Sequence, residues 1–265
     1  MKVMKFGGTS VGSPERMKEV VNLILKDKKE VFVVLSAMSG TTNTLIEIAD
    51  YLYKKNHEGA NEIINRLEQK YISYIDELYS TNEYKEKIYN FFQKEFNYLR
   101  SFTNDIFTSF EEKSIVARGE ILSTNMVVNY LLENGIKAKL INALDFMRTD
   151  KNSEPDAVYI KEKLSAIMAS NNDYQVYITQ GFICKNAYGE VDNLQRGGSD
   201  YTASLVGAAI NAEEIQIWTD IDGMHNNDPR IVENTEAVRQ LNFEEASELA
   251  YFGAKILHPT CVQPA

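Results

Sequence analysis

A lysine and two glycines stand close together near the start of the chain, in the segment KFGGTS at residues 5–10. Gly7 and Gly8 allow the backbone to approach an anion closely, and a helix that begins after them presents free N–H groups and a partial positive charge. Lys5 adds a full positive charge, so the segment predicts a phosphate-binding turn. A tight strand–helix turn with a lysine that reaches solvent explains the same residues without a ligand.

A second Gly-Gly turn lies in the segment QRGGSD at residues 195–200. Arg196 offers a planar fork that suits a carboxylate or a phosphate, and Ser199 adds a hydroxyl. Asp200 is well placed to cap the next helix, and capping is the better explanation of this residue taken alone. The repetition of a Gly-Gly turn with a basic residue shortly before it weakens that explanation and favours an anion site.

Polar residues follow an apolar run in WTDIDGMHNNDPR at residues 218–230. Thr219 and Asp220 end the run, at the position where open α/β sheets bind their ligands. An ordinary turn explains the pair Asp222-Gly223. It does not explain Thr219, Asp220 and Arg230 together, so this segment is a third candidate for binding.

Two further segments carry charges at the ends of expected helices. ARGE at residues 117–120 places opposite charges at a helix start, and most such pairs are solvated surface ions. GAKILHP at residues 253–259 ends a helix with Lys255, where a cation suits the helix dipole. His258 precedes a proline, and we interpret it as structural.

The elements that position these groups alternate in the manner of a parallel sheet. Ser13 is expected to cap a helix with Pro14 at its first position, and Asn242 to cap another with Glu245. Expected strands are 1–6, 30–38, 138–142, 175–183 and a buried strand at 215–219; expected helices are 16–26, 114–132, one from the turn at 152–156 to about 170, 200–210 and one ending at 252. The fold class is therefore α/β.

Residues 51–113 differ from this pattern. They are rich in Tyr, Phe, Glu and Lys and read as two or three amphipathic helices. No linker rich in Gly, Pro or Ser flanks them, so we expect a helical insertion within the α/β domain and not a separate domain.

Composition limits the classes of partner. The chain has 265 residues and a net charge of −10, which disfavours nucleic acids and anionic membranes. Cys184 and Cys261 lack the spacing of a redox or zinc motif, so a reducing compartment is expected. No signal peptide and no membrane-spanning apolar run is recognisable. These features predict a soluble protein of the cytoplasm.

Taken together, the segments resemble the aspartokinases, within the amino-acid kinase family. The resemblance rests on KFGGTSVGS at 5–13, SAMSGTTN at 36–43, ARGE at 117–120, GFI at 181–183, RGGSDYTAS at 196–204, WTDIDGMHNNDPR at 218–230 and FGAKILHP at 252–259. It implies a three-layer αβα sandwich with a mainly parallel sheet. It also implies ATP and Mg²⁺ as cofactors and L-aspartate as the substrate, phosphorylated to 4-phospho-L-aspartate in the first step of lysine, threonine and methionine biosynthesis.

The resemblance also implies roles for individual residues. Nucleotide contacts are implied for Lys5, Gly7, Gly8, Ser10, Thr219, Asp220, Arg230 and Lys255, with His225 where a tyrosine is usual near the base. Substrate contacts are implied for Ser39, Thr42, Glu120, Phe182, Arg196 and Ser199. Glu120 would bind the ammonium of aspartate and Arg196 a carboxylate. The catalytic residues would be Lys5, Asp200 and Lys255, with Asp200 organising the lysines or the metal.

The chemistry agrees with these roles. The β-carboxylate of aspartate has a reference pKa of about 3.9 and is already ionised at neutral pH, so no general base is needed. Catalysis must instead compensate charge between two anions and hold them in line. The sequence offers no His/Cys metal cluster, which suits an Mg²⁺ ion held by phosphates, water and one or two carboxylates.

Two other functions explain the same motifs. Another amino-acid kinase with a glutamate-type substrate, or a nucleotide-binding fragment without activity, fits the same motifs. Aspartokinases continue beyond the last motif, so we expect residues 1–265 to be a catalytic domain without its C-terminal end and without regulatory ACT-type domains. A homo-oligomer is left open.

Overall fold

The structure is a computed structural model of the chain, and it describes all residues except 105–106, 171–172, 195–196, 229–230 and 253–257. In the described part, one sheet has five strands in the order β3-β4-β2-β1-β7. Its neighbouring strands all pair in parallel. The strands are β1 (Lys2–Phe6), β2 (Val31–Leu35), β3 (Ala138–Leu140), β4 (Val176–Gln180) and β7 (Glu214–Trp218).

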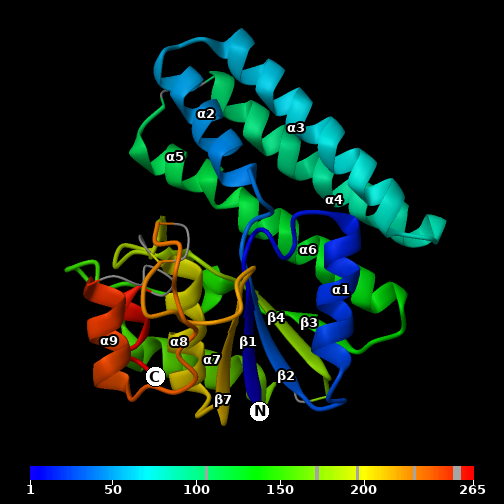
Figure 1. Ribbon diagram of the computed structural model, residues 1–265. Helices are drawn as coiled ribbons and strands as arrows, with labels where there is room; N and C mark the ends of the chain where they lie inside the picture. The colour runs from blue at the N-terminus through cyan, green and yellow to red at the C-terminus, as the bar shows by residue number, and fades with distance from the viewer. Residues whose placement is uncertain (105–106, 171–172, 195–196, 229–230, 253–257) are drawn as a thin grey trace.

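Helices cover both faces of this sheet (Figure 1). The first face packs against α1 (Pro14–Leu25) and α6 (Arg118–Glu133), and the second against α7 (Ala157–Ala169) and α8 (Gly198–Ala209). Alternate residues of each strand point to opposite faces. In β2, Val33 thus belongs to the first core and Val34 to the second. The expected three-layer sandwich with a parallel sheet is confirmed.

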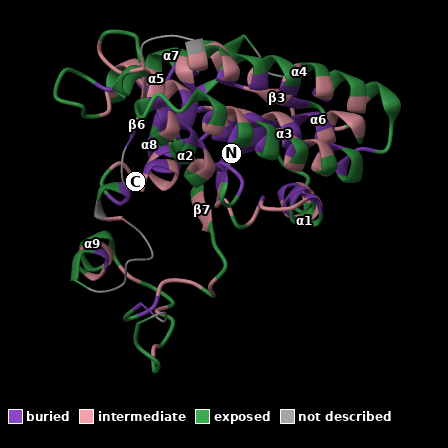
Figure 2. Ribbon diagram, turned by 90° about the horizontal axis from the view of Figure 1, so that it is seen from above, coloured by how far each residue is buried: buried purple, intermediate pink, exposed green. Residues whose placement is uncertain are grey.

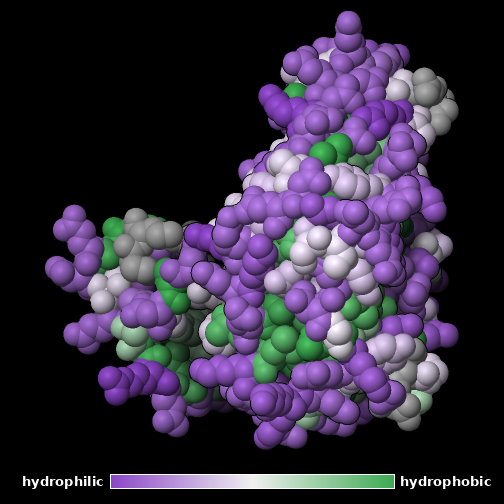
Figure 3. Space-filling view, turned by 90° about the vertical axis from the view of Figure 1, so that its right-hand side faces the viewer, coloured by the Kyte–Doolittle hydropathy of each residue, from purple (hydrophilic) through white to green (hydrophobic). Residues whose placement is uncertain are grey.

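An arm of helices lies above the sheet (Figure 1) and spans 41–116, which includes residues 51–113 of the expected helical insertion. It consists of α2 (Thr41–Tyr53), α3 (His57–Leu78), α4 (Asn82–Ser101) and α5 (Ser109–Val116), with a short 3₁₀ turn at Phe102–Asn104. Its core contains Tyr71, whose ring centroid lies 5.2 Å from that of Phe92 and 6.2 Å from that of Phe96. Figure 3 shows a mainly hydrophilic surface on the upper part of the molecule, where the arm lies. Among the described helices, none is long and apolar enough to cross a membrane.

Local signals in the sequence set several helix starts. The Ser13 hydroxyl accepts a hydrogen bond from the Arg16 N–H at 3.4 Å, and Pro14 is the first residue of α1. The side chain of Asn242 accepts from the Glu245 N–H at 2.8 Å at the start of α9 (Phe243–Phe252), and Glu245 accepts from the Asn242 N–H at 2.9 Å. Both predicted caps are therefore confirmed.

The strand expected at residues 175–183 is shorter than predicted. β4 ends at Gln180, and β5 (Ile183–Lys185) pairs antiparallel with β6 (Val191–Asn193) in a separate hairpin. Phe182, between β4 and β5, has a φ of +68° and so turns the chain out of the first sheet. A continuous apolar run does not reveal this reversal, which the sequence analysis missed.

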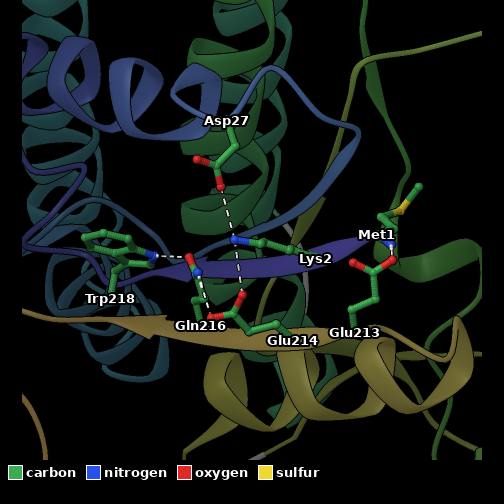
Figure 4. Close-up of polar contacts among 7 residues, drawn as sticks. All are labelled: Met1, Lys2, Asp27, Glu213, Glu214, Gln216 and Trp218. Atoms are coloured by element: carbon green, nitrogen blue, oxygen red, sulfur yellow. Dashed lines mark hydrogen bonds and ion pairs between the residues drawn. The ribbon is translucent and has the colours of Figure 1, made fainter.

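The strand expected to be buried at 215–219 is instead the half-exposed edge strand β7. Ile215 and Ile217 pack against the second core, while Glu214, Gln216 and Trp218 share the opposite face. Figure 4 shows the polar contacts there. Lys2 pairs with Asp27 at 3.0 Å and with Glu214 at 3.1 Å, and the Trp218 indole donates to Gln216 at 3.0 Å. Beyond β7, α9 and the preceding loop extend to the side of the main body (Figure 2).

Candidate active site

A cavity of about 470 Å³ lies where β1, β2 and β4 end. It brings together many residues that the sequence analysis singled out, from five separate segments. These are Lys5, Gly8, Ser39, Thr42, Glu120, Phe182, Ser199 and Asp200. The carboxyl ends of parallel strands meet at one edge of a sheet, and this explains why segments far apart in the sequence converge here.

Lys5 and Asp200 form an ion pair in this cavity. The Lys5 Nζ lies 2.6 Å from Asp200 Oδ1, and the two side chains are only 12% and 16% exposed. Helix capping, the alternative explanation of Asp200 from the sequence, does not apply, because Gly197 is the N-cap residue of α8, with a φ of +72°. The left-handed conformation of Gly197 starts the helix at Gly198, so Asp200 lies within the first turn and faces Lys5.

Close backbone approaches explain two of the glycines. A Cβ atom at Gly8 would lie 2.6 Å from the carbonyl oxygen of Ala37, so any side chain would push the first turn away from the end of β2. A Cβ atom at Gly198 would lie 2.5 Å from Cδ2 of Phe182. Glycine therefore allows both turns to pack against the other walls of the cavity.

Glu120 is a buried carboxylate, only 3% exposed, that lines the cavity. Its Oε1 accepts a hydrogen bond from the Ala37 N–H at 3.2 Å, while Oε2 is buried and has no hydrogen-bond partner in the described part of the chain. Burial raises the pKa of Glu120 to about 8. A solvated surface pair with Arg118, the alternative explanation of ARGE, does not form, because Arg118 binds Glu95 at 2.9 Å. An unpaired buried carboxylate oxygen suits a cationic group.

Phe182 lines the same cavity in a strained backbone conformation, since a φ of +68° is rare for a bulky residue. Its N–H donates to the Thr202 hydroxyl at 3.0 Å, and that hydroxyl donates to the Gly198 carbonyl at 2.7 Å. Its carbonyl accepts from the Leu194 N–H at 2.8 Å. These bonds fix the aromatic ring beside the second glycine turn.

Other residues expected to bind the nucleotide lie in a second cavity of about 290 Å³. Ser10, Thr219 and Asp220 line it, together with Arg16 and Trp218. The Thr219 hydroxyl donates to Asp220 at 3.1 Å. The remaining residue of the first turn, Gly7, accepts a hydrogen bond from the Ser10 N–H at 3.0 Å. Of the expected nucleotide residues, Lys5 and Gly8 thus line the first cavity, while Ser10, Thr219 and Asp220 line the second.

His225 is held within its own loop. Its Nε2 lies 2.6 Å from Asp222, its Nδ1 lies 2.9 Å from the Thr235 hydroxyl, and the residue is 7% exposed. The hydrogen bond from His225 holds the pKa of Asp222 below its usual range. His225 is not among the described residues that line either cavity. The nucleotide contact expected for it stays a prediction.

Three expected site residues, Arg196, Arg230 and Lys255, lie outside the described residues. The sequence analysis missed other lining residues, among them Ser36, Met38 and Asn43 in the first cavity and Arg16 in the second. Ser36, Met38 and Asn43 lie within the recognised motif at 36–43, and Arg16 lies shortly after the motif at 5–13, and this position was the only signal that could have found them. No group of three or more potential metal-binding His, Cys, Asp or Glu side chains occurs in the described part of the chain.

Comparisons with known proteins identify relatives of the chain. Lysine-sensitive aspartokinase 3 of Escherichia coli is 32% identical over 99% of this chain and 58% of its own length. Chloroplastic aspartokinase 1 of Arabidopsis thaliana is 37% identical over 99% of this chain and 48% of its own length. The chain therefore spans about half the length of these curated relatives.

Aspartokinases are also found among the solved structures that resemble this chain. Aspartokinase III of E. coli in complex with aspartate and ADP has a TM-score of 0.88 and 32% identity, covering 100% of this chain and 59% of that one. Aspartate kinase of Clostridium acetobutylicum has a TM-score of 0.79 and 25% identity. The model of the amino acid kinase family matches residues 1–265. The chain belongs to the amino acid kinase family.

Proposed function

We propose that the chain carries the catalytic part of an aspartate kinase, which transfers the γ-phosphoryl group of ATP to the β-carboxylate of L-aspartate. The observation that carries this proposal is the cavity that combines the unpaired Glu120 carboxylate with the Lys5–Asp200 ion pair. Similarity to the E. coli enzyme solved with aspartate and ADP supports it. In this proposal, the reaction is the first step in the biosynthesis of lysine, threonine and methionine.

Substrate binding in this proposal uses the wall of the cavity that contains Glu120. The buried Oε2 of Glu120 binds the ammonium group of aspartate and so gains the partner that it lacks. The hydroxyls of Ser39, Thr42 and Ser199 donate to the carboxylates, and the Phe182 ring covers the substrate. Arg196, outside the described residues, is assigned to a carboxylate by resemblance alone.

Phosphoryl transfer takes place at the wall of the cavity that contains Lys5 and Asp200. An oxygen of the β-carboxylate attacks the γ-phosphorus, a new O–P bond forms, and the bond to the leaving ADP oxygen breaks without transfer of a proton. Lys5 supplies positive charge where the two anions meet, and Asp200 holds the Lys5 ammonium in place. Gly7, Gly8 and Ser10 contact the phosphates in this proposal. Thr219, Asp220, His225, Arg230 and Lys255 are proposed to complete the nucleotide site.

Mg²⁺ fits the residues present. Asp200 places one carboxylate at the cavity, and no cluster of three or more ligands occurs among the described residues. Mg²⁺ is commonly bound through one or two carboxylates and the substrate phosphates, so Asp200 would hold it together with ATP. When bound, the ion neutralises phosphate charge.

Trapping of the acyl phosphate as a hydroxamate tests the proposal. With ATP and Mg²⁺, L-aspartate should give hydroxamate, while L-glutamate and N-acetylglutamate should give little. A larger yield from glutamate would favour another amino-acid kinase. Nucleotide binding without any acyl phosphate would favour a binding fragment.

A further inference from the structure

Residues 36–43, which comprise the loop after β2 and the first residues of α2, form one wall of the first cavity. Two hydrogen bonds tie the beginning of this loop to α6. The Ala37 N–H donates to Glu120 Oε1 at 3.2 Å, and the Ser123 hydroxyl donates to the Ser36 carbonyl at 2.8 Å. The beginning of the loop is therefore fixed by the same helix that carries the buried carboxylate.

The start of α2, which follows the loop, is fixed from a different part of the molecule. The hydroxyls of Thr41, the first residue of α2, and Tyr71, in α3, lie 3.0 Å apart. Thr41 is 0% and Tyr71 1% exposed, so the bond is shielded from water. In the sequence, Thr41 stands between Gly40 and Thr42, which both line the cavity. The core of the helical arm is thus bonded to the cavity wall.

The Thr41–Tyr71 bond helps to hold the start of α2 in place, because no side chain caps this helix. Its N-cap residue is Gly40, with a φ of +81°, and glycine has no side chain that can accept from the first N–H groups. Two buried hydroxyls that satisfy each other resist separation, since each would otherwise be left without a partner in a dry core. Burial raises the pKa of Tyr71 and outweighs the lowering effect of its bond to Thr41, so its hydroxyl keeps its proton.

We infer that Tyr71 is a positioning residue for substrate binding, because its bond to Thr41 fixes the first turn of α2 and therefore the Thr42 hydroxyl in the cavity. The inference rests on the proposed function in one respect, that the ligand is L-aspartate. It assigns to the helical arm a part in substrate recognition, although Tyr71 itself does not line the cavity.

Three variants and one control test this role. Tyr71→Phe keeps the ring that packs on the aromatic core of α4, and Thr41→Val removes the other hydroxyl. The double variant removes both. Tyr79→Phe is the matched control, because Tyr79 is also buried at 2% exposed and its hydroxyl donates to the Met126 carbonyl at 2.6 Å. Neither Tyr79 nor Met126 is among the described residues that line the cavity.

The first measurement is the KM for L-aspartate in the hydroxamate assay. Tyr71→Phe and Thr41→Val should each raise KM by about tenfold with kcat nearly unchanged, since one buried bond is lost in each. The double variant should be no worse than either single variant, because no hydroxyl is left unpaired. Tyr79→Phe should lower the melting temperature without a change in KM. An equal rise of KM in Tyr79→Phe, or no rise in Tyr71→Phe, would overturn the inference.

The second measurement needs no substrate. Hydrogen exchange of the backbone N–H groups of residues 37–44 should be faster in Tyr71→Phe than in the wild type and unchanged in Tyr79→Phe. Unchanged exchange in Tyr71→Phe would overturn the inference even if the chain phosphorylates aspartate. If the wild type gives no aspartyl hydroxamate, the proposed function fails. Faster exchange in Tyr71→Phe alone would then still support the anchoring of the loop.

Discussion

Lys5 Nζ and Asp200 Oδ1 lie 2.6 Å apart and join the two Gly-Gly turns of the chain. Lys5 is near the end of β1, and Asp200 is in the first turn of α8. The pair is largely buried, so its charges act in a medium that screens them less than bulk water does. It fixes the position of the ammonium group on which the proposed phosphoryl transfer depends.

Lys5→Ala should lower kcat by roughly 10²–10³-fold, the loss typical for removal of one group that stabilises developing negative charge. The measurement is hydroxamate formation from L-aspartate. Lys2→Ala is the matched control, because Lys2 lies in the same strand but pairs with Asp27 and Glu214 on the surface. Near-normal turnover in Lys5→Ala would exclude the proposed role of this lysine.

Asp200→Asn should lower kcat strongly while the fold is retained, because the amide cannot neutralise and orient the Lys5 ammonium. Loss of a helix cap is not expected, since Gly197 and not Asp200 is the N-cap residue of α8. Turnover and thermal unfolding of the same preparation check this. If the melting temperature falls and turnover does not, Asp200 only stabilises the fold.

Glu120 should make the folded state less stable as the pH rises. Its carboxyl loses a proton near pH 4.5 in the unfolded chain and near pH 8 in the folded one. Between these values the folded state holds the extra proton, so a rise in pH favours unfolding. Glu120→Gln removes this effect and should raise the melting temperature more at pH 8.5 than at pH 5.

Thermal unfolding of the wild type and Glu120→Gln from pH 5 to pH 9 is the measurement for that prediction. The same variant should lose affinity for L-aspartate, because a neutral amide replaces the carboxylate proposed for the ammonium. A difference in melting temperature that does not change with pH would show that Glu120 does not titrate in this range.

Gly8→Ala should destabilise the protein by about 1–3 kcal/mol, the usual cost of forcing an extra methyl group into a packed site. The new Cβ would lie 2.6 Å from the Ala37 carbonyl oxygen, which belongs to the backbone and cannot rotate away. Gly7→Ala serves as the comparison, because its Cβ would meet only the Lys5 Nζ, at 3.6 Å. Denaturant unfolding of both variants checks this. Equal losses would mean that close packing is not the reason for Gly8.

Elements that depend on local interactions could be predicted from the sequence. The alternation of apolar runs and amphipathic segments predicted the sheet and its two helical layers, because periodicity reports which face of an element is buried. Caps at Ser13 and Asn242 were predictable because a cap bonds to N–H groups only a few residues away. The two Gly-Gly turns and their nearby basic residues indicated where an anion would bind.

Contacts between residues from different segments depend on the tertiary fold and could not be predicted from the sequence. From the sequence alone, Asp200 could be a helix cap and Glu120 a surface charge. In the fold, Asp200 lies beside Lys5, and Glu120 is buried where α6 packs against the end of β2. Whether β7 lies at the edge or the centre of the sheet depends on which strands pair with it. The bond between Tyr71 and Thr41 likewise joins two separate helices. These contacts link residues distant in the sequence, and burial and charge at such positions follow from packing that no local pattern encodes.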